Sequence, residues 1–124
     1  MKHRLLVLPT VALALASGPA FAQAPAGERL FNQQCKQCHT VENGGAHGLG
    51  PNLHGMFDRK AGSVEGFKAS DAMKASGITW DDATLAEYLR DPKGRVPGTT
   101  MVHAGIKQPA QLNQLIDYLR KSVK

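Results

Sequence analysis

Both cysteines of the chain lie in one short motif, CKQCH at residues 35–39. Two residues separate Cys35 from Cys38, and His39 follows directly. Three chemistries compete for such a cysteine pair: a structural disulfide, a metal or redox C-x-x-C site, and covalent attachment of a haem. The residues around the motif decide among them.

The first two chemistries leave part of the motif without a role. A structural zinc site needs about four Cys or His ligands in paired spacings, and the chain has no second pair of cysteines. A thioredoxin-like redox pair expects a βαβ setting, but alternating strand patterns are absent here. A disulfide is ordinary in an exported protein, yet it gives no reason for His39.

Haem attachment gives all three side chains a role. On a helix, residues three apart share a face, so Cys35 and Cys38 can each form a thioether with one vinyl group of the haem. His39 then lies beneath the ring as an iron ligand, with its second ring nitrogen hydrogen-bonded to fix the tautomer. We therefore predict one covalently bound haem c.

The second axial position of the iron separates a carrier from an enzyme, because an open position admits substrate and a closed one does not. Met101 is favoured as the closing ligand, since it follows the irregular stretch RVPGTT far from the cysteine motif. The residues alone leave the other histidines and methionines open as candidates: Met56, Met73, His47, His54 and His103.

The first 22 residues have the layout of a secretory signal peptide. A basic start (Lys2, Arg4) leads through an apolar stretch over residues 5–16 to small residues at Ala20 and Ala22. The apolar stretch is shorter than the roughly 20 residues that a bilayer requires. We expect cleavage after Ala22 and a single domain over residues 23–124. We also expect that the protein lies in the periplasm of a bacterium and does not span the membrane.

Charge and length narrow the class further. The chain of 124 residues fits one domain. Its formal net charge of +5 falls to +3 without Lys2 and Arg4, and the remaining basic residues are spread along the sequence. Nucleic-acid binding calls for a basic stripe or a recognisable fold signature, so we expect none.

Hydrophobic spacing and capping residues predict helices separated by loops. Pro25 suits a first helical position, and the helix should run into the cysteine motif. Residues 41–66 are rich in glycine, which favours a long irregular loop. A short helix is expected over residues 70–76, with Ser70 or Asp71 as its cap.

Two further helices complete the predicted class. One covers residues 79–90, with Thr79 and Asp82 as a capping box, and should stop before Asp91 and Pro92. The other begins at Pro109 and has the clearest amphipathic pattern. Its apolar face comprises Leu112, Leu115, Ile116, Leu119 and Val123. The fold class is all-α with long loops.

The segments GERLFNQQCKQCHTVENGGAHGLGPNLHGMFDRKAG, GFKASDAMKASGITW, LAEYLRDPKGRVPGTTM and LIDYLR resemble class I cytochromes c, closest in pattern to the mitochondrial cytochrome c and bacterial cytochrome c2 group. The resemblance covers the whole region after the leader. It implies the cytochrome c fold, in which three main helices, short helices and long loops wrap one covalent haem. It also implies that Gly27 and Phe31 cross the last helix near Leu115 and Tyr118.

The resemblance implies a role for each matching residue. His39 and Met101 match the two iron ligands, and Pro51 matches the residue whose carbonyl holds the proximal histidine. Four further matches are Arg59 and Trp80 near a haem propionate, Tyr88 beside the methionine sulfur, and Thr99 as another hydrogen-bonding residue of the pocket.

Several positions depart from the mitochondrial pattern. Ala69 replaces a propionate-binding tyrosine, Met73 an asparagine, and His103 an aromatic residue at the exposed edge. Since haem potential depends on surrounding hydrogen bonds and burial, the potential of relatives does not transfer. Some lysines of the exposed edge are also missing, with Gln34, Gly94 and Thr100 in their places, while Lys93 and Lys107 remain.

The function we expect is that of a soluble, monomeric one-electron carrier. By resemblance, its donor is a quinol-oxidising membrane complex and its acceptor a terminal oxidase or photosynthetic reaction centre, both docked transiently. One alternative is a dedicated electron-accepting subunit of a periplasmic dehydrogenase. The other is a small haem enzyme or gas sensor with an open sixth position.

Overall fold

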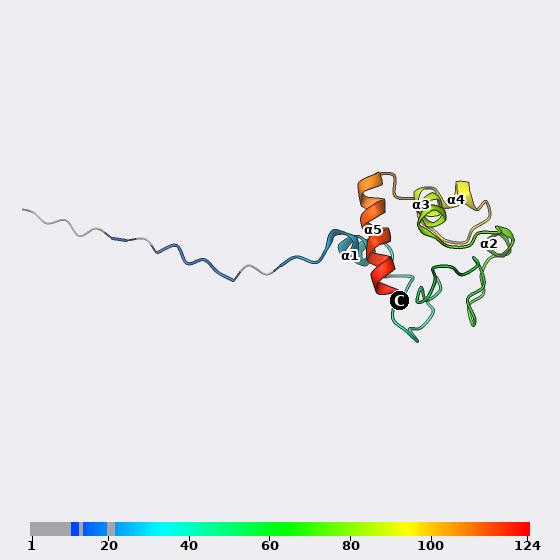
Figure 1. Ribbon diagram of the computed structural model, residues 1–124, viewed down its shortest axis with the longest axis horizontal. Coiled ribbons are helices and arrows are strands. Elements are labelled where there is room, and N and C mark those ends of the chain that lie inside the picture. Colours follow the sequence, from blue (N-terminus) through cyan, green and yellow to red (C-terminus); the bar gives the residue numbers. More distant parts are fainter. Residues whose placement is uncertain (1–10, 13, 20–21) are drawn as a thin grey trace, which may run out of the picture.

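The structure, a computed structural model, describes residues 11–12, 14–19 and 22–124. Within these residues there are five helices, in chain order α1 (Ala26–Gln34), α2 (Asp71–Ala75), α3 (Asp82–Arg90), α4 (Pro92–Arg95) and α5 (Pro109–Ser122) (Figure 1). Among these described residues, β-structure is limited to one isolated antiparallel bridge between Lys60 and Thr79. The predicted all-α class with long loops is confirmed.

The segment that precedes α1 is only partly described. Of the predicted signal peptide, residues 1–10, 13 and 20–21 lie outside the described residues, and with them part of its expected cleavage region. The described residues before α1 have no regular secondary structure. In the described part of the chain, no helix combines the length and apolar character that a membrane span needs.

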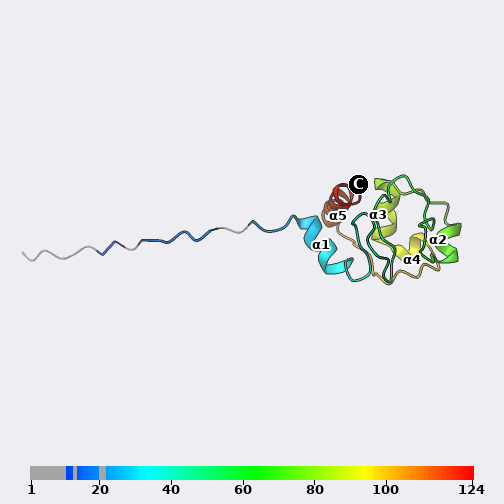
Figure 2. The ribbon, with the colours of Figure 1, turned by 90° about the horizontal axis from the view of Figure 1, so that it is seen from below.

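The first and last helices pack against each other and form one side of the molecule, as both ribbon views show (Figures 1 and 2). Gly27 allows the close approach, because a Cβ there would overlap the Gln114 carbonyl oxygen and the Tyr118 side chain. The Phe31 and Tyr118 rings lie 5.4 Å apart between centroids. The crossing predicted from the sequence is therefore present.

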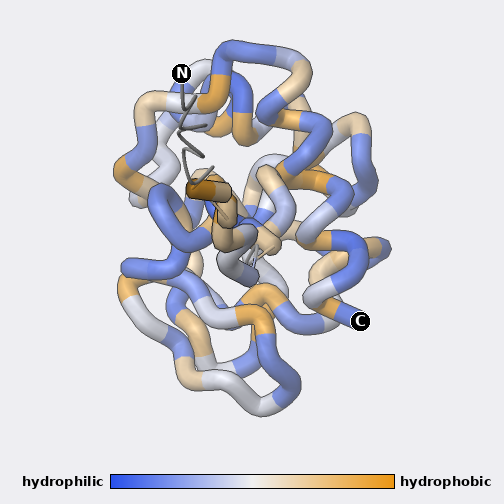
Figure 3. Tube along the Cα trace, turned by 90° about the vertical axis from the view of Figure 1, so that its left-hand side faces the viewer, coloured by the Kyte–Doolittle hydropathy of each residue, from blue (hydrophilic) through white to orange (hydrophobic). Residues whose placement is uncertain are grey.

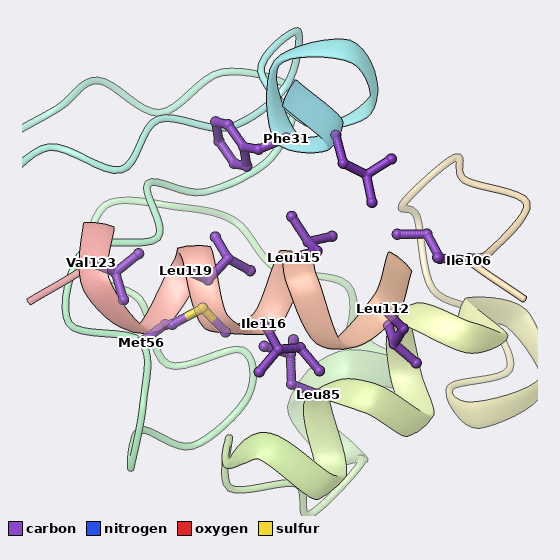
Figure 4. Close-up of a cluster of buried hydrophobic side chains, with 10 residues drawn as sticks. Phe31, Met56, Leu85, Ile106, Leu112, Leu115, Ile116, Leu119 and Val123 are labelled. Carbon is purple, nitrogen blue, oxygen red and sulfur yellow. The ribbon is translucent and has the colours of Figure 1, made fainter. Parts of the chain in front are cut away.

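The hydrophobic core is built around α5. Figure 4 shows its side chains with Phe31 approaching from α1 and Leu85 from α3. The buried members are Leu30, Phe31, Met56, Leu85, Ile106, Leu112, Leu115, Ile116, Leu119 and Val123. Along the trace, short hydrophobic stretches alternate with hydrophilic loops (Figure 3). The five-residue apolar face predicted for the last helix is thus buried as expected.

Both ends of α1 differ from the prediction. Pro25 caps the helix instead of being its first residue, and the helix ends at Gln34. Cys35 has φ −121°, and both Cys35 and Lys36 donate their backbone N–H to the Phe31 carbonyl. This shared acceptor ends the regular ladder. The cysteines therefore lie on a hydrogen-bonded turn that follows the helix, not on the helix itself.

The cap of α2 agrees with the sequence, and that of α3 does not. Ser70 accepts a hydrogen bond from the Met73 N–H. In α3 the capping box joins Asp81 and Thr84, not Thr79 and Asp82. Thr79 is engaged elsewhere, since it bridges to Lys60 and its carbonyl accepts from the Thr84 hydroxyl.

The chain between α3 and α5 also contains a short helix that the sequence pattern did not predict. As predicted, α3 stops before Asp91 and Pro92. A further turn, α4, begins there because Pro92 suits a first helical position and Asp91 accepts from the Gly94 N–H. Its four residues are too few for periodicity to reveal. The last helix begins at Pro109, as the sequence predicts.

The α1–α5 crossing can be tested with Gly27→Ala. In an exposed helix interior this change is stabilising by helix propensity alone, but here the added methyl overlaps the α5 backbone. We expect a loss of about 1–3 kcal/mol in the free energy of unfolding, typical of overpacking. Denaturant unfolding of the haem-loaded protein measures it. Asn32→Ala, at an exposed position of the same helix, should show no such loss.

The α3 cap predicts a pH dependence of stability. Hydrogen bonds from the backbone and side chain of Thr84 hold the pKa of the Asp81 carboxyl below its ordinary 3.8. Because the folded-state pKa is the lower one, the ionised cap stabilises the protein above about pH 4 and loses that contribution as pH falls through the folded pKa.

The Asp81→Ala variant should therefore have a lower Tm than the parent at neutral pH, with a difference that shrinks on acidification. Thermal unfolding from about pH 7 to pH 3 checks this expectation. A matched change at Asp117, an exposed carboxylate of α5, should leave Tm nearly unaltered. A difference for Asp81→Ala that stays constant across this range would contradict the argument.

Candidate haem site

A cavity of about 350 Å³ lies between the core and the loops, a volume within the range of cofactor and ligand pockets. Most of its lining is apolar, and the core residues Phe31, Leu115 and Leu119 form part of its wall. All nine residues singled out as site residues line it: Cys35, Cys38, His39, Pro51, Arg59, Trp80, Tyr88, Thr99 and Met101. Residues separated by more than 60 positions in sequence are thus brought to one cavity.

The two cysteine thiols are free and half-buried on the turn after α1. The turn is closed by hydrogen bonds from the Cys38 and His39 N–H groups to the Cys35 carbonyl, both 3.0 Å. Desolvation, with a smaller contribution from neighbouring Cys38, raises the pKa of the Cys35 thiol to about 11. Cys35 is therefore held as a neutral thiol beside the cavity at neutral pH.

The imidazole of His39 is fixed in one tautomer. Its Nδ1 lies 2.8 Å from the Pro51 carbonyl oxygen, which can only accept, so Nδ1 carries the proton and donates. Nε2 then keeps a free lone pair, the form that binds a metal. Desolvation lowers the pKa of His39, although the bond to Pro51 opposes the shift. Burial therefore favours the neutral ring, and the Pro51 contact fixes its tautomer.

Gly50 presses against the His39 ring. A Cβ at this position would overlap Cε1, Nδ1 and Nε2 of the imidazole. The Gly50 N–H donates to the Cys38 carbonyl at 2.9 Å, which ties the glycine-rich loop back to the cysteine turn. The absence of a side chain at residue 50 is thus required for the ring to occupy its place.

Met101 enters the cavity from the irregular segment that precedes α5, and it is half-buried. Its N–H donates to the Thr99 hydroxyl oxygen at 3.4 Å, and that hydroxyl shares a 2.7 Å hydrogen bond with the Tyr88 hydroxyl of α3. Burial raises the pKa of Tyr88, although the bond to Thr99 opposes the shift. A neutral phenol therefore anchors the segment that carries Met101.

Arg59 and Trp80 are brought together by a short stretch of paired backbone. The Trp80 N–H donates to the Arg59 carbonyl at 3.0 Å, next to the bridge between Lys60 and Thr79. The Arg59 guanidinium donates to the His54 carbonyl oxygen, and the Trp80 ring lies 5.4 Å from that of Tyr88. The two residues form one wall of the cavity.

The other histidines and methionines considered from the sequence divide into two groups. Met56, Met73 and His103 line the cavity, whereas His47 and His54 do not. Met56 is also buried in the core, as Figure 4 shows beside α5. Met73 and Ala69, two of the departures from the mitochondrial pattern, place apolar side chains on the cavity wall.

Two polar residues hold the loops around the cavity, a role that sequence reasoning gave to neither of them. Asn52 is buried, and its side-chain amide donates to the Thr40 hydroxyl and the Glu42 carbonyl. His47 accepts at Nδ1 from the Asn52 N–H and contacts the Glu65 carbonyl through Nε2 at 3.0 Å. Their place within the long glycine-rich segment was the only signal in the sequence.

The residues present fit a haem. The cavity is largely apolar, as a porphyrin requires, and two free thiols stand at its edge three residues apart. His39 presents the unprotonated nitrogen that an iron ligand needs, and the Gly50 position leaves its ring room. Cys35 and Cys38 would hold the group, and His39 would contact its metal.

Comparisons with known proteins agree with this geometry. The sequence model of the cytochrome c family matches residues 24–122. Cytochrome c of Gibberella zeae is 51% identical over 98 residues, which cover 79% of this chain and 92% of that protein. Cytochrome c of Stellaria longipes is 50% identical over 101 residues, covering 82% and 94%. Cytochrome c2 of Blastochloris viridis is 44% identical over 119 residues, covering 95% and 93%.

The fold and the cavity together define a small all-α protein whose cavity fits a haem held by two cysteines. The chain belongs to the cytochrome c family, in the class I group that the motifs resemble. Its fold is that of the family, it binds haem c through its two cysteines, and it is an electron carrier of that family.

The contact between Gly50 and His39 predicts the effect of Gly50→Ala. The methyl group must displace the imidazole, which weakens its bond to the Pro51 carbonyl. We expect a loss of about 1–3 kcal/mol in the free energy of unfolding of the haem-loaded protein, as for other overpacked sites. Denaturant unfolding measures it. Leu49→Ala, at the exposed neighbouring position, should cost far less.

Proposed function

We propose that this protein is a diffusible one-electron carrier whose haem iron is closed on both faces by His39 and Met101. The observation that carries the proposal is that both side chains line one cavity although 62 positions separate them. A closed iron needs no change of ligands between its two oxidation states. A carrier, and not an enzyme with an open sixth position, is therefore the function proposed.

The proximal side of the proposal rests on the fixed tautomer of His39. The Pro51 carbonyl accepts a hydrogen bond from the Nδ1–H group, so the unprotonated Nε2 is left to bind. A ring oriented by a second hydrogen bond keeps its position and basicity. Cys35, four residues before His39, and Cys38, directly before it, would hold the edge of the same group.

The distal side rests on the anchoring of the Met101 segment. Thr99 and Tyr88 link this segment to α3 by side-chain hydrogen bonds. When bound, the haem supplies an iron that exchanges one electron, and a methionine ligand raises the potential of such an iron. Arg59 and Trp80 are proposed to face a propionate, since both line the same wall.

Electron exchange with partners is proposed to occur at the mouth of the cavity. Leu49 and Val102 line the cavity and are 86% and 94% exposed, so they offer a small apolar rim there. By the resemblance, Lys93 and Lys107 are proposed to supply positive charge near this edge, although Lys107 also donates to the Arg90 carbonyl at the end of α3. Such a surface suits brief docking that salt weakens.

The proposed setting is the periplasm of a bacterium, with residues 1–22 as a signal peptide cleaved after Ala22. The match to the family model begins at residue 24. The alignment with the Blastochloris viridis cytochrome c2 spans 95% of this chain and so must include most of the leader. The proposed donor is a quinol-oxidising complex, and the acceptor a terminal oxidase or reaction centre.

The ligand set is tested by the absorption spectrum of the oxidised protein. Iron bound to a methionine sulfur has a weak sulfur-to-iron charge-transfer band towards the red, which Met101→Ala should abolish. The reduced variant should then bind carbon monoxide, because its sixth position is open. Binding of carbon monoxide by the unmodified reduced protein at the same rate would contradict a closed iron.

A second methionine of the cavity gives the matched control. Met73 lines the same space from α2, so Met73→Ala removes a comparable sulfur from the same surroundings. The band should persist in this variant. If it vanishes in Met73→Ala and persists in Met101→Ala, the ligand is Met73 and the assignment is wrong.

A further inference from the structure

Two side chains bridge the mouth of the cavity. The His103 Nε2 lies 2.9 Å from Oε1 of Gln34, although the two residues are 69 positions apart. Gln34 is the last residue of α1, directly before Cys35, and His103 follows Met101 by two residues. Both side chains line the cavity. The contact therefore joins the cysteine side of the site to the segment that carries Met101.

The hydrogen bonds of His103 define its tautomer. The Gly105 N–H donates to Nδ1 at 2.8 Å, so Nδ1 carries no proton. The proton of the neutral ring is then on Nε2, which donates to the Gln34 oxygen. Both ring nitrogens are engaged, and neither offers a lone pair to the cavity. His103 consequently acts as a strut and not as a competing ligand.

The residues that follow His103 are held against the end of α3. Gly105 has φ +98°, and a Cβ there would overlap the Arg90 carbonyl oxygen. The next residue, Ile106, donates its N–H to the Leu89 carbonyl at 2.8 Å and is buried in the core. Residues 105–106 are thus fixed on the end of α3, while the Val102 side chain beside them is exposed.

We propose that the Gln34–His103 hydrogen bond is a clasp that keeps the Met101 segment closed over the cavity and so limits the access of small external ligands to the iron. The inference rests on the proposed ligation by Met101. An external ligand must first displace Met101, which requires the segment to move away from α1. The clasp opposes that movement because it spans the two sides.

The test uses the oxidised holoprotein at one neutral pH, with imidazole as the external ligand and the sulfur-to-iron band as the signal. Gln34→Ala should raise the apparent association constant for imidazole by roughly fivefold, the factor that one ordinary hydrogen bond is worth. His103→Phe keeps a ring but removes both nitrogens, and it should give a similar increase. The double variant should bind imidazole no tighter than either single variant, because one bond is lost in each case.

Three controls separate the clasp from a general loss of stability. Gln34→Glu retains an acceptor for the Nε2 proton and should bind imidazole as weakly as the parent. Gln33→Ala, at the exposed neighbouring position, should have no effect. The midpoint of global denaturant unfolding should move little in Gln34→Ala, because the position is on the surface.

The outcomes distinguish this inference from the function on which it rests. If the parent protein shows no sulfur-to-iron band, the Met101 ligation is wrong and the clasp is rejected with it. If the band is present but Gln34→Ala leaves the imidazole constant unchanged, the ligation stands and the clasp is overturned. Independent increases that multiply in the double variant would also overturn it.

Discussion

The contact between α1 and α5 is the constraint on which the remainder of the structure depends. Gly27 brings the two backbones together, and Phe31 packs on Tyr118 from the same helix face. The cysteine turn follows α1 within one residue, so the crossing also sets where the thiols stand. Leu115 and Leu119 of α5 belong both to the core and to the cavity wall. The hydrophobic core and the haem site therefore share side chains, and the packing of one determines the shape of the other.

Away from this crossing, the loops are held in place by side-chain hydrogen bonds and not by regular secondary structure. Asn52 and His47 hold the loop between the cysteine turn and α2. The Asn52 side-chain amide donates to the Thr40 hydroxyl and the Glu42 carbonyl, and His47 contacts the Glu65 carbonyl. A buried amide that lost these partners would be costly. This explains how a long glycine-rich segment can form a defined wall around a cofactor.

Local signals in the sequence predicted the local parts of this arrangement. The cysteine motif needs only five consecutive residues, and the apolar face of α5 repeats over four turns, so both were evident. Ser70 as the cap of α2 was likewise a neighbouring-residue effect. The class of fold and the covalent haem followed from these features together with the family resemblance.

What the sequence could not supply depends on distant contacts. The α3 cap was misassigned because Thr79 is engaged by Lys60, a partner 19 positions away. Four residues are too few to reveal α4. The fixed tautomer of His39 and the bridge from His103 to Gln34 require that loops meet in space. The assignment of Met101 as a ligand still rests on its place in the cavity and on resemblance.

The pairing of the first and last helices has a consequence for when this protein can fold. Because α1 needs α5 to bury its apolar face, the core cannot close before ribosomal synthesis has passed residue 122. Contacts between such distant segments also form slowly. A nascent chain with its cysteine motif already made therefore stays open and unfolded. That delay leaves both thiols accessible for attachment of the haem until α5 has been made.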